Sequence, residues 1–283
     1  MRTIILNSTN YVVGSGNEFV YRFPSSVKFA EGDQIGLQSI AIYNSTFNVS
    51  SLLGNNSITL VWNASSPVSY TFTIPDGYYS VPQLNYFLQQ KMVENKLYVV
   101  NSSSQNIYFA EIVVNEPRYA VSINLYPIPT SAEATTLGYT QPSGATWSYP
   151  AASACPQLTL SSGFGSLLGF EAGTYPTLAT ESTTQQFISA QTPKLNVVDS
   201  YILTCSLIHN NYSIPSDAFY QVPLNAGLGE LITVQNEIVF NDIASNTYLQ
   251  ISIKFFDQLF NKLVLNDTQL TMSLVIRSKG EYA

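Results

Sequence analysis

Cys205 and His209 are the two residues whose types and spacing could support catalysis. His209 is the only histidine of the chain, and Cys205 precedes it by four residues. On a straight strand both side chains would point to the same face, where an imidazole could activate a thiol as a nucleophile. The segment 201–208 is mostly apolar, and a small buried thiol in a strand core is the commoner role of a free cysteine. A thiol hydrolase using Cys205 and His209 is therefore a minor alternative.

Other patterns that could bind a ligand are incomplete. Residues 163–169 read GFGSLLG, which is one residue too long for GxGxxG and contains no lysine, so we predict a tight backbone turn rather than a phosphate loop. Acidic residues form no calcium-loop pattern, and Asp242 and Asp257, near strand ends, are expected to form Asx turns. The sequence thus predicts no catalytic, cofactor-binding or metal-binding residue.

The composition favours a protein that contacts other proteins. Of 283 residues, only 10% are charged, against about 25% in an ordinary soluble domain, while 13% are aromatic. The net charge is −7 and no cluster of Lys and Arg occurs, which argues against direct binding to nucleic acid. No apolar run approaches the 18 residues or so of a membrane span, and the N-terminal residues do not resemble a signal peptide. Cys155 and Cys205 are therefore expected to be free thiols in a cytoplasmic setting.

The pattern of short apolar runs and turn residues predicts an all-β fold with one helix. The helix is expected at 81–94, where Ser80 and Gln83 can form a capping box before apolar residues at helical spacing. Residues 130–166 are rich in Ser, Thr, Ala, Gly and Pro and are predicted to form a long loop. Strands are expected at 3–6, 18–23, 34–43, 57–62, 69–74, 97–100, 107–114, 119–126, 194–208, 218–222, 237–240, 248–256 and 269–277.

Several segments, taken in order, resemble the penton (minor capsid) proteins of virophages and Polinton-like viruses. The resemblance covers about residues 74–277, and it depends on the order and spacing of short pieces rather than on any one of them. Residues 130–166 match nothing in that family. The pieces are IPDGYYS at 74–80, LLGF at 167–170, AGTYP at 172–176, the strand at 201–208, ISIKFFDQ at 251–258 and LVIR at 274–277.

The resemblance implies a single jelly roll of two four-stranded antiparallel sheets that forms homopentamers at the fivefold vertices of an icosahedral capsid. It also implies a structural, non-enzymatic protein of the virion, assembled in the host cell cytoplasm. Its partners would be its own copies and a double jelly-roll major capsid protein. We place the jelly roll at 1–56 and 192–283, and an inserted, mainly-β domain with the one helix at 57–191, projecting at the capsid exterior.

Two further expectations concern the strand pairing of this jelly roll and an alternative function. Greek-key connections should pair the early strands at 18–23 and 34–43 with the late strands at 248–256 and 269–277. The abundance of Tyr and Asn also fits a carbohydrate-binding β-sandwich, which stays open as a functional alternative.

Overall fold

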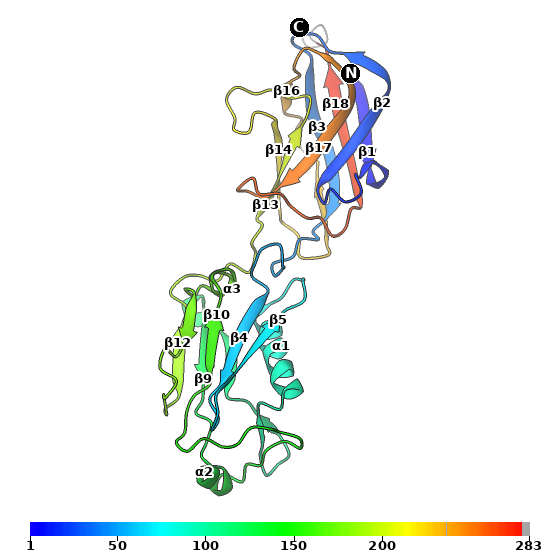
Figure 1. Cartoon of the computed structure of the whole chain (residues 1–283). Helices are drawn as coiled ribbons and strands as arrows, with labels where there is room; N and C mark the ends of the chain where they lie inside the picture. Colours follow the sequence, from blue (N-terminus) through cyan, green and yellow to red (C-terminus); the bar gives the residue numbers. More distant parts are fainter. Residues whose placement is uncertain (236, 279–283) are drawn as a thin grey trace. The chain divides into compact units, whose positions relative to one another are not determined.

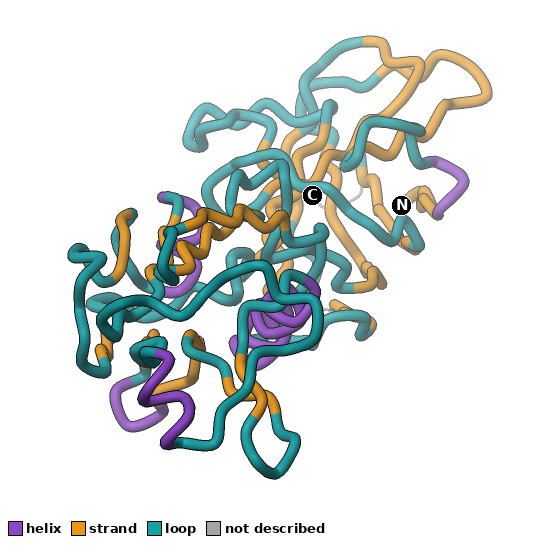
Figure 2. The backbone as a smooth tube through the Cα atoms, turned by 60° about the horizontal axis from the view of Figure 1, so that its bottom comes forward, coloured by secondary structure: helices purple, strands orange, loops and turns teal. Residues whose placement is uncertain are grey.

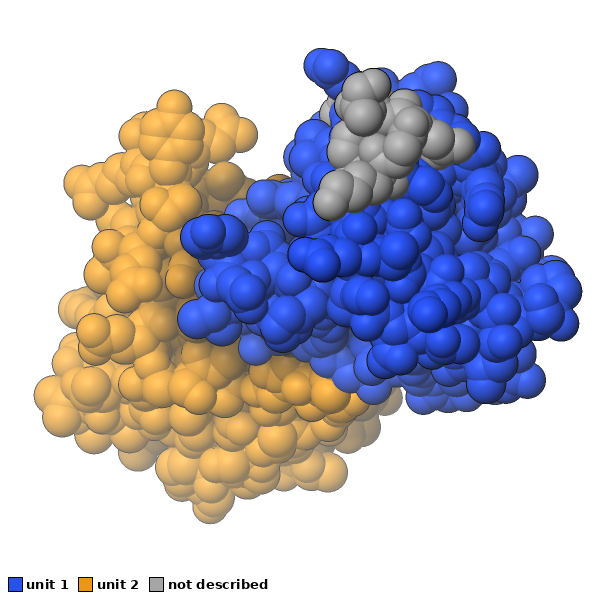
Figure 3. Space-filling model, turned by 90° about the horizontal axis from the view of Figure 1, so that it is seen from above, with its two compact units in different colours: residues 1–46, 198–283 blue, residues 47–197 orange. Residues whose placement is uncertain are grey.

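The computed structural model describes residues 1–235 and 237–278, and it divides the chain into two compact units (Figures 1 and 3). Unit 1 combines Met1–Thr46 with residues 198–283, and unit 2 is Phe47–Val197. Unit 2 thus includes residues 47–56 and 192–197, which the sequence analysis assigned to the jelly roll. Asn48 explains this placement, because its amide donates to the carbonyls of Tyr79 (2.8 Å) and Leu195 (3.0 Å) within unit 2. Across the described residues, no helix is long and apolar enough to cross a membrane.

Unit 1 consists of two antiparallel sheets. Sheet A has the order β1 (Arg2–Asn7), β18 (Leu270–Arg277), β3 (Gln34–Tyr43) and β15 (Leu231–Val234), with β16 (Phe240–Asp242) also pairing with β3. Sheet B has the order β14 (Ala218–Pro223), β13 (Ser200–Cys205), β17 (Thr247–Phe256) and β2 (Glu18–Lys28). The short helix η1 (Ser8–Asn10) follows β1, close to the N-terminus (Figure 2).

The predicted pairing of early with late strands is confirmed. β2 pairs with β17, with Phe19 opposite Ile253, and β3 pairs with β18, with Ile40 opposite Met272. Along the chain, the first three strands alternate between the sheets, and β17 in sheet B precedes β18 in sheet A. β15 and β16 pair with different halves of β3 and share one position in the sheet. This connectivity is that of a single jelly roll, and unit 2 is inserted between β3 and β13.

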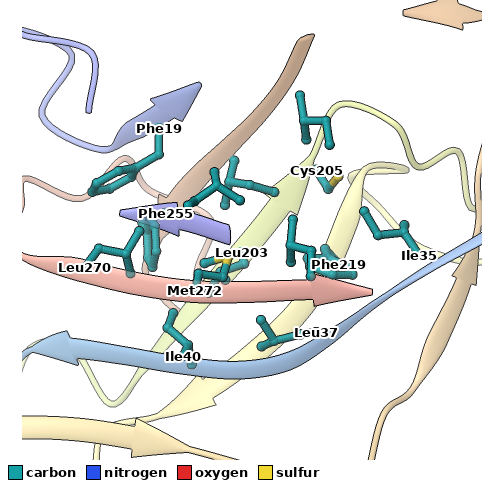
Figure 4. Packing of buried hydrophobic residues seen from close by; sticks show 14 of the residues in the cluster. Phe19, Ile35, Leu37, Ile40, Leu203, Cys205, Phe219, Phe255, Leu270 and Met272 are labelled. Carbon is teal, nitrogen blue, oxygen red and sulfur yellow. The ribbon is translucent and has the colours of Figure 1, made fainter. Parts of the chain in front are cut away.

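Side chains from both sheets of unit 1 meet in one apolar core (Figure 4). Along β17, buried Ile251, Ile253 and Phe255 alternate with more exposed polar residues, as expected for a strand with one face in the core. The ring of Phe255 packs edge-on against Phe19 and Tyr201, with centroids 5.7 and 6.1 Å apart. The core therefore depends on aromatic contacts between strands from both ends of the chain.

Unit 2 has its own core and several small antiparallel sheets. One sheet has the order β11 (Gly173–Tyr175), β10 (Gln157–Leu160), β4 (Ser57–Trp62) and β5 (Val68–Thr73). A second has the order β12 (Gln185–Ile188), β9 (Ala120–Leu125) and β8 (Ala110–Asn115), and β6 (Val99–Val100) pairs with β7 (Asn106–Ile107). The 3₁₀ helix η2 (Glu116–Arg118) links β8 to β9.

The helix predicted at 81–94 is confirmed as α1 (Val81–Glu94). The Ser80 N–H donates to Gln83 Oε1 at 2.8 Å, which closes the predicted capping box at the first turn. The helix buries Leu84, Leu88 and Met92, which recur on one face. Helix α1 is therefore held by its cap and by its apolar side.

The predicted loop at 130–166 is wrong, as is the prediction of a single helix in the insertion. This segment contains α2 (Ser131–Thr136) and the start of α3 (Ser162–Leu168), besides β10. Thr130 and Ser161 cap these helices by accepting hydrogen bonds from the N–H groups of Glu133 and Phe164. The predicted tight turn at 163–169 is therefore α3, and Gly169 ends it with φ +81°.

The strands expected at 194–208 and 237–240 are also corrected. Only Ser200–Cys205 and Phe240–Asp242 form strands there.

Candidate assembly surfaces

The structure does not bring Cys205 and His209 together as an activated pair. β13 ends at Cys205, and the chain turns there, because the Ile208 N–H donates back to the Cys205 carbonyl at 3.0 Å. Cys205 is buried and His209 is exposed. Burial raises the pKa of the Cys205 thiol to about 12, whereas a nucleophilic cysteine needs a lowered pKa. The thiol-hydrolase alternative is therefore abandoned.

The other residues singled out from the sequence have structural surroundings. Cys155 is buried in unit 2, where burial, together with the charge of Glu181, raises its pKa to about 11, and both thiols are free as predicted. Asp257 forms the expected turn, since its Oδ1 accepts from the N–H groups of Leu259 and Asn261, each at 2.8 Å. Asp242 instead lies in β16. Within residues 1–235 and 237–278, no group of His, Cys, Asp and Glu is placed to hold a metal ion.

One flank of the jelly roll, formed by β1 and β2, carries exposed basic residues. η1 links these two edge strands, and Asn10 Nδ2 reaches the Val20 carbonyl of β2 at 3.1 Å. Arg2, Arg22 and Lys28 are exposed here, and we call this surface the basic flank. Glu18, at the start of β2, is offset by Lys254, whose Nζ lies 3.9 Å from its carboxylate.

The opposite flank, formed by β14, β15 and β16, carries acidic residues. Asn241 Nδ2 of β16 donates to the Phe219 carbonyl of β14 at 3.4 Å, which joins the edges of the two sheets. We call this surface, with Asp217, Glu230, Glu237 and Asp242, the acidic flank. The chain has no Lys or Arg between Lys194 and Lys254.

Arg277 lies beside the acidic flank and is already engaged there. Its guanidinium stacks on the Phe240 ring, 3.7 Å from the centroid, and donates to Gln34 Oε1. Gln34 in turn donates to Asp242 Oδ1 at 2.8 Å. Glu230, Glu237 and Asp242 are exposed, and Asp242 is in addition held in this local network by Gln34.

Both flanks also expose apolar side chains at sheet edges. Ile5 of β1 is exposed on the basic flank, and Leu231 and Val239 are exposed beside the acidic flank. Edge strands present unpaired backbone groups that favour contact with another chain unless they are covered. The two flanks therefore combine the features of a contact surface: a free edge, apolar area and charge.

The turn after β17 presents two further apolar side chains in a fixed conformation. Phe260 has φ +60°, which is rare for a bulky residue, and Leu259 beside it is exposed. Asp257 fixes this turn through Leu259 and Asn261, and its carbonyl accepts from the Phe260 N–H. Strained residues held in this way occur at functional surfaces more often than elsewhere.

Unit 2 contains a shallow groove of mixed character. Two adjoining depressions of about 820 and 350 Å³ share Pro127, Pro129 and Leu137. Tyrosine side chains line the smaller depression, Tyr126 and Tyr139 among them. The Tyr126 hydroxyl donates to Glu111 at 2.6 Å, and this hydrogen bond, with burial, raises the pKa of Tyr126 to about 12.

Sequence reasoning did not identify the flanks. The signal was present as the stretch from 195 to 253 without a Lys or Arg, against Arg2, Arg22 and Lys28 near the N-terminus. This uneven distribution of charge can be interpreted only when the strand order is known, because residues from distant segments share a flank only in the folded sandwich.

The strand order defines unit 1 as a jelly roll interrupted by a second folded unit. No family model matches the chain, and no curated protein matches it. Among solved structures, the chain is similar to the crystal structure of the selenomethionine-labelled mavirus penton protein, with a TM-score of 0.42 and 10% identity over 98% of this chain and 100% of that one. This is the same group of proteins that the sequence resembles. The likeness is distant, so the jelly-roll assignment rests on this chain's own strand pairing.

Proposed function

We propose that this chain is a structural capsid protein that forms homopentamers at the fivefold vertices of an icosahedral virion. The observation that carries the proposal is the jelly roll of unit 1, whose edge strands, among the described residues, pair on one side only and carry opposite charges. Jelly rolls are a common architecture of viral capsid proteins, in which neighbouring copies form a shell. A chain that has one contact surface on each side can join copies of itself into a closed ring.

The partners follow from this role. Copies of the chain would contact one another through unit 1, and a double jelly-roll major capsid protein would surround the ring in the virion. The turn at Leu259 and Phe260 is a candidate contact for that second partner, because an exposed aromatic in a fixed turn loses little conformational freedom on binding. Assembly in the host cell cytoplasm fits two free thiols.

We place unit 2 as a domain projecting from the jelly roll at the capsid exterior. It is inserted between β3 and β13 and has its own apolar core, as expected of a module added at a loop. Its basic residues are Lys91, Lys96, Arg118 and Lys194, which its acidic residues outnumber. A surface facing packaged nucleic acid would be expected to carry more positive charge.

The oligomeric state tests this proposal directly. We expect native mass spectrometry of the purified chain to show a species of five times the 31.2 kDa monomer, because ring closure covers both free edges. Light scattering at rising concentration should show the same species. A chain that remains monomeric at micromolar and higher concentrations in near-physiological buffer would contradict the proposal.

The groove of unit 2 supports carbohydrate binding as a second candidate function. Tyrosine rings offer faces on which sugar rings stack, and the hydroxyls and carboxylates nearby can bond to sugar hydroxyls. If the groove binds glycans, Tyr139→Ala should weaken binding on a glycan array about tenfold. Tyr119→Ala, at an exposed position not among the groove residues, is the matched control and should bind as the parent does. An array without any binding would remove this candidate.

A further inference from the structure

We propose that copies of this chain join head to tail, with the basic flank of one unit 1 against the acidic flank of the next. The inference rests on the homopentamer of the proposed function and adds to it which surfaces meet. Both flanks belong to the rigid sandwich itself, since β1 and β2 form one and β14, β15 and β16 form the other.

The signs of the charges select this arrangement over a twofold contact. In a twofold contact the same surface meets itself, so Arg2, Arg22 and Lys28 would face their own copies. Like charges placed opposite each other across an interface are unfavourable, and opposite charges favour encounter in one register. The head-to-tail contact is therefore the one in which both flanks find a complementary surface.

Apolar side chains and strand edges supply the rest of the contact. Ile5 on one flank and Leu231 and Val239 on the other are exposed, and a charge-poor, apolar centre is typical of protein interfaces. Exposed ion pairs alone are weak, so the charges mainly set which flanks meet and how fast. A head-to-tail contact leaves one free flank at each end of a chain of copies until the ring closes.

Charge reversal on one flank at a time tests the proposal. In one variant, Arg22→Glu and Lys28→Glu make both flanks acidic. In a second, Glu230→Lys and Glu237→Lys place two bases beside Asp217 and Asp242, which cancels the negative charge of the acidic flank. We expect each variant to need about tenfold or more of the parent concentration for half-assembly, measured by light scattering at low salt, because the attraction between the flanks is lost in the second variant and becomes repulsion in the first. The difference should shrink in high salt, which screens exposed charges.

The combined variant with all four substitutions distinguishes a disrupted interface from a folding defect. The four substituted positions again carry opposite charges across the contact, with the signs exchanged, so pentamers should return although the chain carries every substitution. A folding defect would not be repaired in this way. Lys91→Glu with Lys96→Glu is the matched control, because it changes the net charge as the first variant does but alters only unit 2.

The outcomes separate this inference from the proposed function. If single-flank variants form pentamers as readily as the parent, or the combined variant fails to recover, the flanks are not the interface, although the pentamer stands. If the parent itself stays monomeric at every salt concentration, the homopentamer and the head-to-tail contact are both overturned.

Discussion

Replacing Gly169 by alanine should destabilise unit 2 by about 2–5 kcal/mol. Gly169 ends α3 with φ +81°, and a Cβ atom there would lie 2.1 Å from the Gln191 carbonyl oxygen. The backbone cannot move aside freely, because the Gln191 N–H donates to the Gly169 carbonyl at 3.1 Å. The left-handed backbone conformation and the clash with the Gln191 carbonyl therefore both reduce the stability of the Gly169→Ala variant. Hydrogen exchange of the buried amides of β9 and β10 would measure the loss.

Gly144→Ala provides the matched control. Gly144 has the same φ of +81°, but a Cβ atom there would meet nothing within 4 Å. Only the conformational cost of about 1–2 kcal/mol should remain. Equal losses at the two positions would show that the close approach of Gln191 contributes nothing to the stability of unit 2.

The second large effect is expected in unit 1, where Phe255→Ala should cost about 3–5 kcal/mol. Phe255 is 0% exposed and packs against Phe19 and Tyr201, so its loss opens a cavity between the two sheets. A loss of this size is a large part of the 5–15 kcal/mol or so that stabilises a domain. Denaturant unfolding should show the transition of unit 1 moving to lower denaturant while that of unit 2 stays in place.

Leu249→Ala on the same strand is the control for Phe255→Ala. Leu249 is 68% exposed, so its truncation should change stability by no more than about 0.5 kcal/mol. A variant at Phe255 that unfolds at the same denaturant concentration as Leu249→Ala would contradict the described core. Movement of both transitions together would instead show that the two units unfold as one.

The elements predicted best from the sequence carry strong local signals. The start of α1 was predicted because Ser80 and Gln83 form a capping box, and its face because Leu84, Leu88 and Met92 recur at helical spacing. The pairing of β2 with β17 and of β3 with β18 followed from Greek-key connectivity. Hydrophobic pattern therefore sufficed for the strands and the helix, whereas the jelly roll was implied by the resemblance to penton proteins.

The failures occurred where contacts distant in sequence decide the structure. α3 was missed because Gly163 and Gly165 disfavour a helix, yet the fold needs them. A Cβ atom would lie 2.6 Å from the Gly54 carbonyl oxygen at Gly163 and 2.9 Å from the Phe170 carbonyl oxygen at Gly165. β2 continues past Pro24, where the prediction ended, because an edge strand does not need every N–H. The flanks were missed because their charges come together only in the sandwich.

Each unit contains one buried cysteine, so the alkylation rate of that cysteine measures how often the unit opens. Cys155 lies in the core of unit 2 and Cys205 in the core of unit 1, and their raised pKa values of about 11 and 12 keep both protonated near neutral pH. An alkylating reagent can then react only during a fluctuation that exposes the sulfur atom. The two labelled peptides are distinguishable by mass, so one sample yields two opening rates. Comparing the labelling rates of Cys155 and Cys205 in the natural chain would therefore show whether the inserted unit can unfold while the jelly roll stays folded.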